Sequence, residues 1–251
     1  QRMIKARSLE EFRRVLDMQA IPMFNIAYAD VEGNCFYINN GRFPDRPKGY
    51  DWSGVVPGGT PDTEWNAIIP QARLPQLLNP ATGYVQNSNS SPWYTNLSAI
   101  IDRKQYAGDV WGNSNSLRTQ HGLKLLEQKA VVTLNDVLRD KHSMLLLAAE
   151  RVKPDLIKVM QPHVTADTLL LECLRVFLAW DNTVSRDSRG SVLFTEFWDR
   201  YSSRAEPVYE VAWDEKHPAS TPHGIGDSEA AIEALRWAAE RVTEKAGALD
   251  V

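Results

Sequence analysis

The sequence predicts an α+β protein, in which a strand-rich segment precedes a mostly helical one. Residues 23–39 alternate apolar and shorter side chains on both sides of a turn, which is the pattern of two paired strands. Beyond residue 96 the apolar positions recur with the helical period of about 3.6 residues. Because strands and helices occupy separate parts of the chain, we expect a β-rich part over residues 1–95 and a mainly helical region over residues 96–251.

The first part begins with a helix and continues with a hairpin. Ser8 and Glu11 have the spacing of a capping box, so we expect an amphipathic helix that runs to about Met18. Residues 30–34 (DVEGN) form a turn between two strands with alternating apolar side chains. The segment from residue 44 to residue 62 is rich in Pro, Gly and Asp, and we expect little regular structure there.

The second part is predicted to be almost entirely helical. Thr133, with Asp136 three residues later, marks one helix start. The longest apolar run, residues 144–149, falls well short of the roughly 18–20 residues that span a bilayer, so we expect a buried helix segment and no membrane span. The helices are expected over residues 117–128, 133–150, 167–180, 192–201 and 227–246.

Composition and charge exclude some classes of partner. The 251 residues are 43% hydrophobic and 24% charged, which is a normal balance for a soluble globular protein. The formal net charge of −4 implies no broad basic surface for nucleic acid. Cys35 and Cys173 both lie among apolar residues, and we expect buried free thiols rather than a disulfide. No CxxC, HExxH or paired His/Cys spacing is present, so we expect no structural zinc. The chain starts at Gln1 and stops directly after a helical pattern, which is typical of an internal piece of a longer protein.

Residues 83–93, GYVQNSNSSPW, concentrate short amide and hydroxyl side chains between aromatic ones. Asn87 and Asn89 form an N-x-N pattern, with Tyr84 before it and Trp93 after it. Asparagine and serine are typical of turns, and that is one interpretation. The other is a set of hydrogen-bond donors directed at a substrate. The residues alone leave both interpretations open.

The order of several motifs resembles the β subunit of the penicillin acylase family, which includes penicillin, cephalosporin and acyl-homoserine-lactone acylases. These are N-terminal-nucleophile hydrolases, made as one precursor that cleaves itself into two chains. The resemblance implies a partial αββα fold of that class and an internal fragment of the β subunit. The motifs are NIAYADVEGNCFYINNGRFPDR, VVPGG, EWNAIIP, LPQLLNPATGYVQNSNSSPW, LLEQK at 125–129, AWD at 179–181 and HPASTP at 217–222.

The resemblance also implies roles for individual residues. In the family an N-terminal serine attacks the amide carbonyl, with its own α-amino group as the base. The second Asn of the N-x-N motif, here Asn89, donates to the oxyanion. Arg118, placed by its distance from LLEQK, positions that Asn and the amino group of the nucleophile. Phe24 aligns with a position that lines the acyl pocket, and Asn25 beside it is a second candidate for substrate binding.

No cofactor is expected. Some members of the family bind a structural calcium ion near the position of Trp52 and through an aspartate after the N-x-N motif. This chain has Ile100 at the matching distance, and Asp102 is out of register, so calcium is not expected here. Asp102 and Asp109 are expected at the surface or in turns.

Residue 1 is Gln, which is not a nucleophile, so the family's N-terminal serine is expected upstream of these residues. The resemblance therefore implies a fragment, inactive alone, of an amidase that hydrolyses N-acyl compounds such as β-lactam side chains or acyl-homoserine lactones. Its partners would be the remainder of the precursor and a small N-acyl substrate, with no nucleic acid and no membrane. The full-length protein is expected in the periplasm or outside the cell. The alternative is a non-catalytic relative that binds a small molecule.

Overall fold

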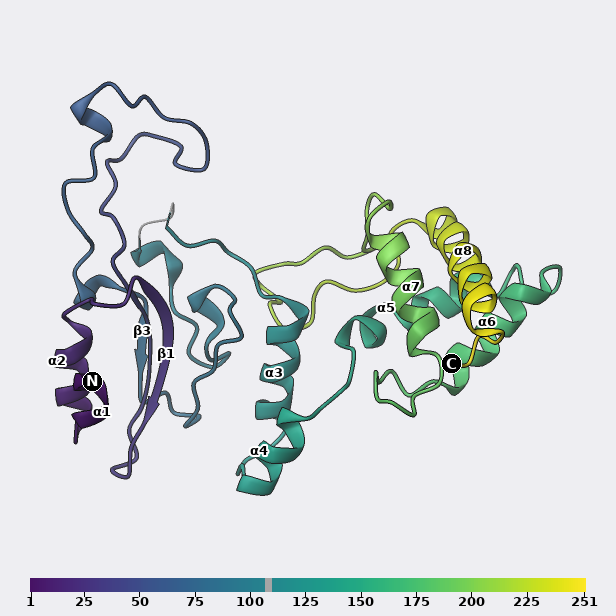
Figure 1. Cartoon of the computed structure of the whole chain (residues 1–251), viewed down its shortest axis with the longest axis horizontal. Helices are drawn as coiled ribbons and strands as arrows, with labels where there is room; N and C mark the ends of the chain where they lie inside the picture. Colours follow the sequence, from purple (N-terminus) through teal and green to yellow (C-terminus); the bar gives the residue numbers. More distant parts are fainter. Residues whose placement is uncertain (107–109) are drawn as a thin grey trace. The chain divides into compact units, whose positions relative to one another are not determined.

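The structure, a computed structural model, describes residues 1–106 and 110–251, and Asp109 lies outside the described residues. The chain forms two compact units, Gln1–Gln128 and Lys129–Val251 (Figure 1). The division expected at residues 95 and 96 separates strand-rich from helix-rich sequence. The two compact units are defined by contacts within each unit and not by secondary-structure content, so the division at residues 95 and 96 stays a prediction.

The first unit contains an antiparallel sheet of order β1-β2-β3. The predicted hairpin is confirmed, with β1 at Met23–Ala29 and β2 at Cys35–Gly41. Asp30 closes the turn by accepting the backbone N–H of Asn34 at 2.9 Å. The third strand, β3 at Gln76–Leu78, was not predicted, because three residues are too few to show an alternation.

Two helices, α1 at Arg2–Lys5 and α2 at Leu9–Leu16, precede the sheet. The predicted cap of the second helix is confirmed, since Ser8 Oγ accepts the N–H of Glu11 at 3.2 Å. The carboxylate of Glu11 accepts the N–H of Arg7 at 2.8 Å, so it satisfies the residue before the cap. The helix ends two residues earlier than expected.

The two faces of the sheet differ in chemistry because successive side chains of a strand point to opposite faces. On one face Ile26 and Ile38, which are paired in register, lie in an apolar cluster with Leu16 of α2. On the other face the register places Asn25 opposite Asn39, and these side chains are polar. This polar face carries the candidate site.

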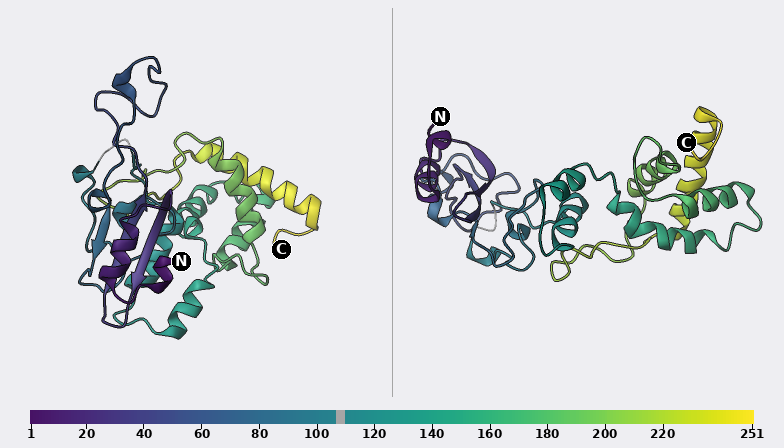
Figure 2. Two further views of the ribbon diagram at one scale, coloured as in Figure 1. Left: turned by 60° about the vertical axis from the view of Figure 1, so that its left-hand side comes forward. Right: turned by 90° about the horizontal axis from the view of Figure 1, so that it is seen from below.

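The segment between β2 and β3 projects from the sheet (Figure 1 and the left view of Figure 2). As expected for residues 44–62, it holds little regular structure. It has two short 3-10 turns, at Pro61–Thr63 and Gln71–Arg73, and an isolated bridge between Pro44 and Ile68. Its shape is supported by aromatic contacts, because Trp52 and Trp65 meet edge to face at 5.9 Å. The guanidinium of Arg46 lies over both rings, at 5.6 and 5.0 Å from their centroids.

Helix α3 at Leu117–Glu127 belongs to the first unit, and the remaining helices form the second unit. Helices α7 and α8 lie side by side (Figure 1). An aromatic-rich cluster forms the core of the second unit, with Phe177, Phe194, Phe197 and Tyr201 fully or almost fully buried. The helices of this unit are α4 at Leu134–Lys141, α5 at Leu147–Met160, α6 at Thr168–Ala179, α7 at Ser191–Ser202 and α8 at Ser228–Ala246.

The prediction of one helix over residues 133–150 is wrong, although its capping box of Thr133 and Asp136 is confirmed. The apolar run divides, because Leu145 forms a β-bridge with Thr183 and the N–H of Leu146 donates to Asn182 at 2.9 Å. These long-range bonds keep the first three residues of the run out of a helix. No described helix is long and apolar enough to cross a membrane.

Both cysteines are free thiols, as predicted. Cys173 is buried, in agreement with the prediction, and burial raises the pKa of its thiol to about 12. The expectation of burial is wrong for Cys35, which is only partly buried because it stands at the first position of β2.

Candidate functional site

The N-x-N segment forms a tight turn in which its two asparagines have different tasks. Asn87 Oδ1 accepts the backbone N–H of Asn89 at 2.7 Å, and its Nδ2 donates to the carbonyl of Ser90 at 3.1 Å. Asn89 has a φ of +66°, in the left-handed region that asparagine tolerates better than most residues. The side chain of Asn87 therefore stabilises the turn, as the turn interpretation predicts. The side chain of Asn89 makes its contacts outside the turn backbone.

Aromatic side chains anchor the turn on both sides. Trp93 and Tyr94 are 2% and 4% exposed, and the indole N–H of Trp93 donates to the carbonyl of Gly112 at 2.9 Å. On the other side the hydroxyl of Tyr84 bonds to a carboxylate oxygen of Glu127 at 3.1 Å. Burial, together with that carboxylate, raises the pKa of Tyr84 to about 12. The aromatic residues that bracket the motif thus fix its ends to the rest of the unit.

The structure brings Arg118 and Asn89, the two candidate catalytic residues, together, and their roles stay predictions. Arg118 Nη2 donates to Asn89 Oδ1 at 2.9 Å and also to the carbonyl of Ser88. A guanidinium has only donors, so the amide oxygen of Asn89 must face it and the Nδ2 group must face away. Within residues 1–106 and 110–251, no protein acceptor is found for this Nδ2, and Asn89 is exposed.

Hydroxyl groups join the start of α3 to the turn. Ser116 caps the helix by accepting the N–H of Thr119 at 3.3 Å. Ser90 Oγ lies 3.1 Å from Ser116 Oγ and 2.5 Å from Thr119 Oγ1. Because Arg118 is in the first turn of the same helix, these bonds also set its position relative to the turn.

Polar side chains beneath the turn connect it to the sheet. Asn87 Nδ2 lies 3.4 Å from the hydroxyl of Tyr37, which donates to Asn25 Oδ1 at 2.6 Å. Asn39 Nδ2 donates to the same oxygen at 2.7 Å, and the indole of Trp111 donates to Asn39 Oδ1 at 2.7 Å. Asn25 therefore joins the site through the hydroxyl of Tyr37.

Phe24 is not brought to this group. By alternation along β1 its side chain points to the face opposite that of Asn25, and 62% of it is exposed. It is therefore not a buried core residue of this chain. Its role in an acyl pocket stays a prediction.

The positions considered for calcium have other surroundings. Ile100 is 48% exposed, and Asp102 caps a 3-10 turn by accepting the N–H of Lys104 at 3.1 Å. Within the part of the chain that the structure describes, no three His, Cys, Asp or Glu side chains are placed to share a metal ion.

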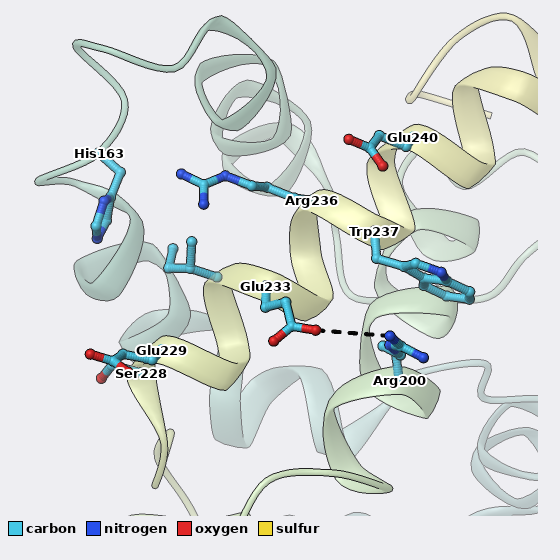
Figure 3. Close-up of a pocket in the computed structure, with 9 residues that line it drawn as sticks. His163, Arg200, Ser228, Glu229, Glu233, Arg236, Trp237 and Glu240 are labelled. Atoms are coloured by element: carbon cyan, nitrogen blue, oxygen red, sulfur yellow. Dashed lines mark ion pairs between the residues drawn. The ribbon is translucent and has the colours of Figure 1, made fainter.

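The second unit has a surface groove of about 500 Å³ along α8 (Figure 3). His163 and Arg200 border it. Arg200 Nη2 lies 3.9 Å from a carboxylate oxygen of Glu233, and its guanidinium lies 5.0 Å from the ring centroid of Trp237. Arg236, which also lines the groove, pairs with Asp167 at 2.9 Å, so both arginines are engaged within the unit. None of the residues implied by the resemblance lies there.

Four residues of this site were not predicted from the sequence: Tyr37, Asn39, Ser90 and Trp111. A signal for two of them was present, because the strand CFYINN carries polar side chains at positions that the structure buries. Tyr37 and Asn39 are separated by two positions and therefore share a face. The contributions of Ser90 and Trp111 depend on long-range contacts and had no local signal.

Comparison with known proteins places the chain in a family. The model of the penicillin amidase family matches residues 1–250, so the chain belongs to that family, and the predicted resemblance is confirmed. Penicillin G acylase of Escherichia coli is 35% identical over 144 residues, covering 54% of this chain and 15% of that protein. Aculeacin-A acylase of Actinoplanes utahensis is 30% identical over 241 residues, covering 78% of this chain and 30% of that protein.

Other matches extend over more of the chain. The acyl-homoserine lactone acylase PvdQ of Pseudomonas syringae pv. syringae is 27% identical and covers 89% of this chain and 31% of that protein. The chain thus spans less than a third of these curated relatives. The solved structure of thermostable penicillin G acylase from Alcaligenes faecalis has a TM-score of 0.65 at 21% identity, covering 97% of this chain and 50% of that one. This likeness confirms the predicted α+β fold of the N-terminal-nucleophile hydrolase class.

Proposed function

We propose that this chain is part of an acylase that hydrolyses the amide bond of N-acyl compounds, and that Asn89 donates a hydrogen bond to the oxyanion of that reaction. The arrangement of Arg118 and Asn89 supports the proposal. Arg118 binds the amide oxygen of Asn89, which leaves a Nδ2 donor of fixed direction on an exposed residue. A donor that is already oriented costs no reorganisation when charge develops on the substrate.

Arg118 has two tasks in this proposal. It holds the amide of Asn89 by its side-chain oxygen and the turn by the carbonyl of Ser88. Its charge would also favour the uncharged form of a neighbouring α-amine, which keeps the base of the nucleophile ready to accept a proton. The nucleophile itself is proposed to be an N-terminal serine outside these 251 residues. The remainder of the precursor would then be the partner of this chain, and export from the cytoplasm stays part of the proposal.

The names of the relatives support an acylase without selecting a substrate. They are a penicillin G acylase, an acyl-homoserine lactone acylase and an aculeacin-A acylase. We propose an N-acyl compound as the substrate class, with Asn25 and Phe24 as candidate contacts.

The test uses the full-length protein that carries this chain, assayed with penicillin G, an acyl-homoserine lactone and aculeacin A. Asn89→Gly keeps the left-handed turn but removes the amide, whereas Asn89→Asp keeps the shape and the bond to Arg118 but replaces the donor with an acceptor. We expect both variants to lower kcat by about 10²-fold or more with little change in KM.

Each other outcome has a clear meaning. A near wild-type kcat in both variants would contradict the proposed role of Asn89. Binding without turnover in the wild-type protein would favour the non-catalytic alternative. The 251 residues expressed alone serve as a control and are expected to be inactive, because residue 1 is Gln rather than a nucleophile.

A further inference from the structure

We propose that Tyr37 is a positioning residue, whose hydroxyl holds Asn87 in the orientation that fixes the turn of Asn89. The proposal rests on the function proposed above for Asn89. Tyr37 lies in β2 on the polar face of the sheet and is fully buried. Its hydroxyl stands between the sheet and the turn, within reach of Asn25 on one side and Asn87 on the other.

The direction of the hydrogen bonds is set at Trp111. An indole N–H only donates, so the oxygen of Asn39 must face it, and the two atoms are 2.7 Å apart. The Nδ2 group of Asn39 then faces Asn25, whose oxygen must accept, again at 2.7 Å. Each amide in this series therefore has one orientation in which every bond has a donor and an acceptor.

The hydroxyl of Tyr37 links the oxygen of Asn25 to the side chain of Asn87 in the turn. Because the oxygen of Asn25 only accepts, the phenolic proton is directed at it, over 2.6 Å. The lone pairs of the phenol are then left for Asn87 Nδ2 at 3.4 Å, and Asn87 Oδ1 accepts the N–H of Asn89 at 2.7 Å. Burial raises the pKa of Tyr37, so the phenol keeps its proton at neutral pH.

Tyr37→Phe keeps the buried ring but removes the hydroxyl, and with it the bonds to Asn25 and Asn87. Asn87 Nδ2 would lose one acceptor, and the bonds left to oppose rotation of the amide would be those to the carbonyl of Ser90 at 3.1 Å and to the N–H of Asn89 at 2.7 Å. A rotated amide would present Nδ2 to the N–H of Asn89, so the left-handed turn would be populated less. We expect kcat to fall by about tenfold with KM little changed, since one hydrogen bond that positions a donor is lost.

The experiment measures kcat and hydrogen exchange in the full-length protein. Tyr28→Phe is the matched control, because Tyr28 lies on the opposite face and donates to Asp30 at 2.9 Å. Exchange of the Asn89 amide, followed by mass spectrometry, should be faster in Tyr37→Phe and unchanged in Tyr28→Phe. Asn87→Ala should reproduce the effects on both kcat and exchange, and it serves as the second variant if Tyr37→Phe does not fold.

Double variants separate positioning from other roles. If Tyr37 acts through Asn89, then Tyr37→Phe should cause no further loss of kcat in the Asn89→Gly background. A further tenfold loss there, or unchanged exchange at Asn89 in both Tyr37→Phe and Asn87→Ala, would overturn the proposal. If Asn89→Gly itself keeps the wild-type kcat, the function proposed for Asn89 fails, while the exchange measurement still decides whether Tyr37 holds the turn.

Discussion

Arg118 donates a hydrogen bond to the side-chain oxygen of Asn89 at 2.9 Å, although 29 positions separate them in the sequence. The same nitrogen donates to the carbonyl of Ser88, so one guanidinium holds both the backbone and the side chain of the turn. This contact joins the start of α3 to the N-x-N motif. It also decides that the amide oxygen of Asn89 faces Arg118 and that the Nδ2 group faces away.

Replacing Arg118 should therefore impair the reaction through Asn89. Arg118→Met removes a charge-assisted hydrogen bond, which is worth about 1.5–3 kcal/mol, so we expect kcat of the full-length enzyme to fall by roughly 10- to 100-fold. Arg118→Lys keeps the charge but not the planar group, so its kcat should lie between those of the wild-type protein and Arg118→Met. Steady-state kinetics with the best acyl substrate measures the effect.

A control separates this effect from a general loss of charge. Arg14→Met removes another arginine of the first unit, which pairs with Glu10 at 3.6 Å on the exposed surface of α2. Its kcat should stay near the wild-type value, because exposed ion pairs contribute little. An equal loss in Arg118→Met and Arg14→Met would exclude a specific role for Arg118.

Phe24 provides a prediction about substrate choice. Its side chain is 62% exposed in this chain, so Phe24→Ala should create no internal cavity and change the melting temperature little. If the ring lines the acyl pocket, its loss should shift preference toward longer or bulkier acyl groups, in steps of up to about 0.8 kcal/mol per methylene. An acyl-length series measured beside a thermal melt tests this. An unchanged length profile would contradict the pocket role.

The sequence predicted the elements whose signals are local. The hairpin, the caps at Ser8 and Thr133, and the helix α8 follow from alternation, spacing and period, and all are confirmed. The break between α4 and α5 was missed because it depends on bonds from Leu145 and Leu146 to residues more than thirty positions away. The contributions of Ser90 and Trp111 to the site were missed for the same reason. The composition of the N-x-N motif does not distinguish Asn87 from Asn89. Only the resemblance to a family singled out Asn89 as the candidate oxyanion donor.

Gly190, which precedes α7, should not tolerate a side chain. Its φ is +112°, and an added Cβ would lie 2.9 Å from Val176 Cγ1 and 3.1 Å from Trp180 Cβ. Strain and overpacking should each contribute about 1–3 kcal/mol, so we expect Gly190→Ala to lower the free energy of unfolding of the second unit by at least 2 kcal/mol. Gly247 is the matched control. It has a φ of +78° with no atom within 4 Å of the added Cβ, and chemical denaturation of Gly247→Ala should show the strain alone.

Asp167 should make the stability of the second unit depend on pH. It caps α6 by accepting the N–H groups of Leu169 and Leu170 at 3.0 and 3.1 Å, and Arg236 donates to its other oxygen at 2.9 Å. The N–H of Leu170, together with the Arg236 guanidinium, holds the pKa of this carboxyl below its usual range. A lowered pKa in the folded state means that the carboxylate stabilises the fold above about pH 4, near the pKa of the unfolded chain, and that this contribution is lost as the pH falls through the lowered value.

Two substitutions divide this contribution into its parts. Asp167→Asn keeps an oxygen for the cap but loses the charge, so its deficit against the wild-type protein should be present at pH 7 and should shrink below about pH 4. Asp167→Ala also loses the cap, which adds about 1 kcal/mol of destabilisation. That additional part does not involve a titrating group and should be the same at both pH values. Urea denaturation of the three proteins at pH 7 and at pH 3 measures both parts, and a deficit of Asp167→Asn that grows on acidification would contradict the assignment.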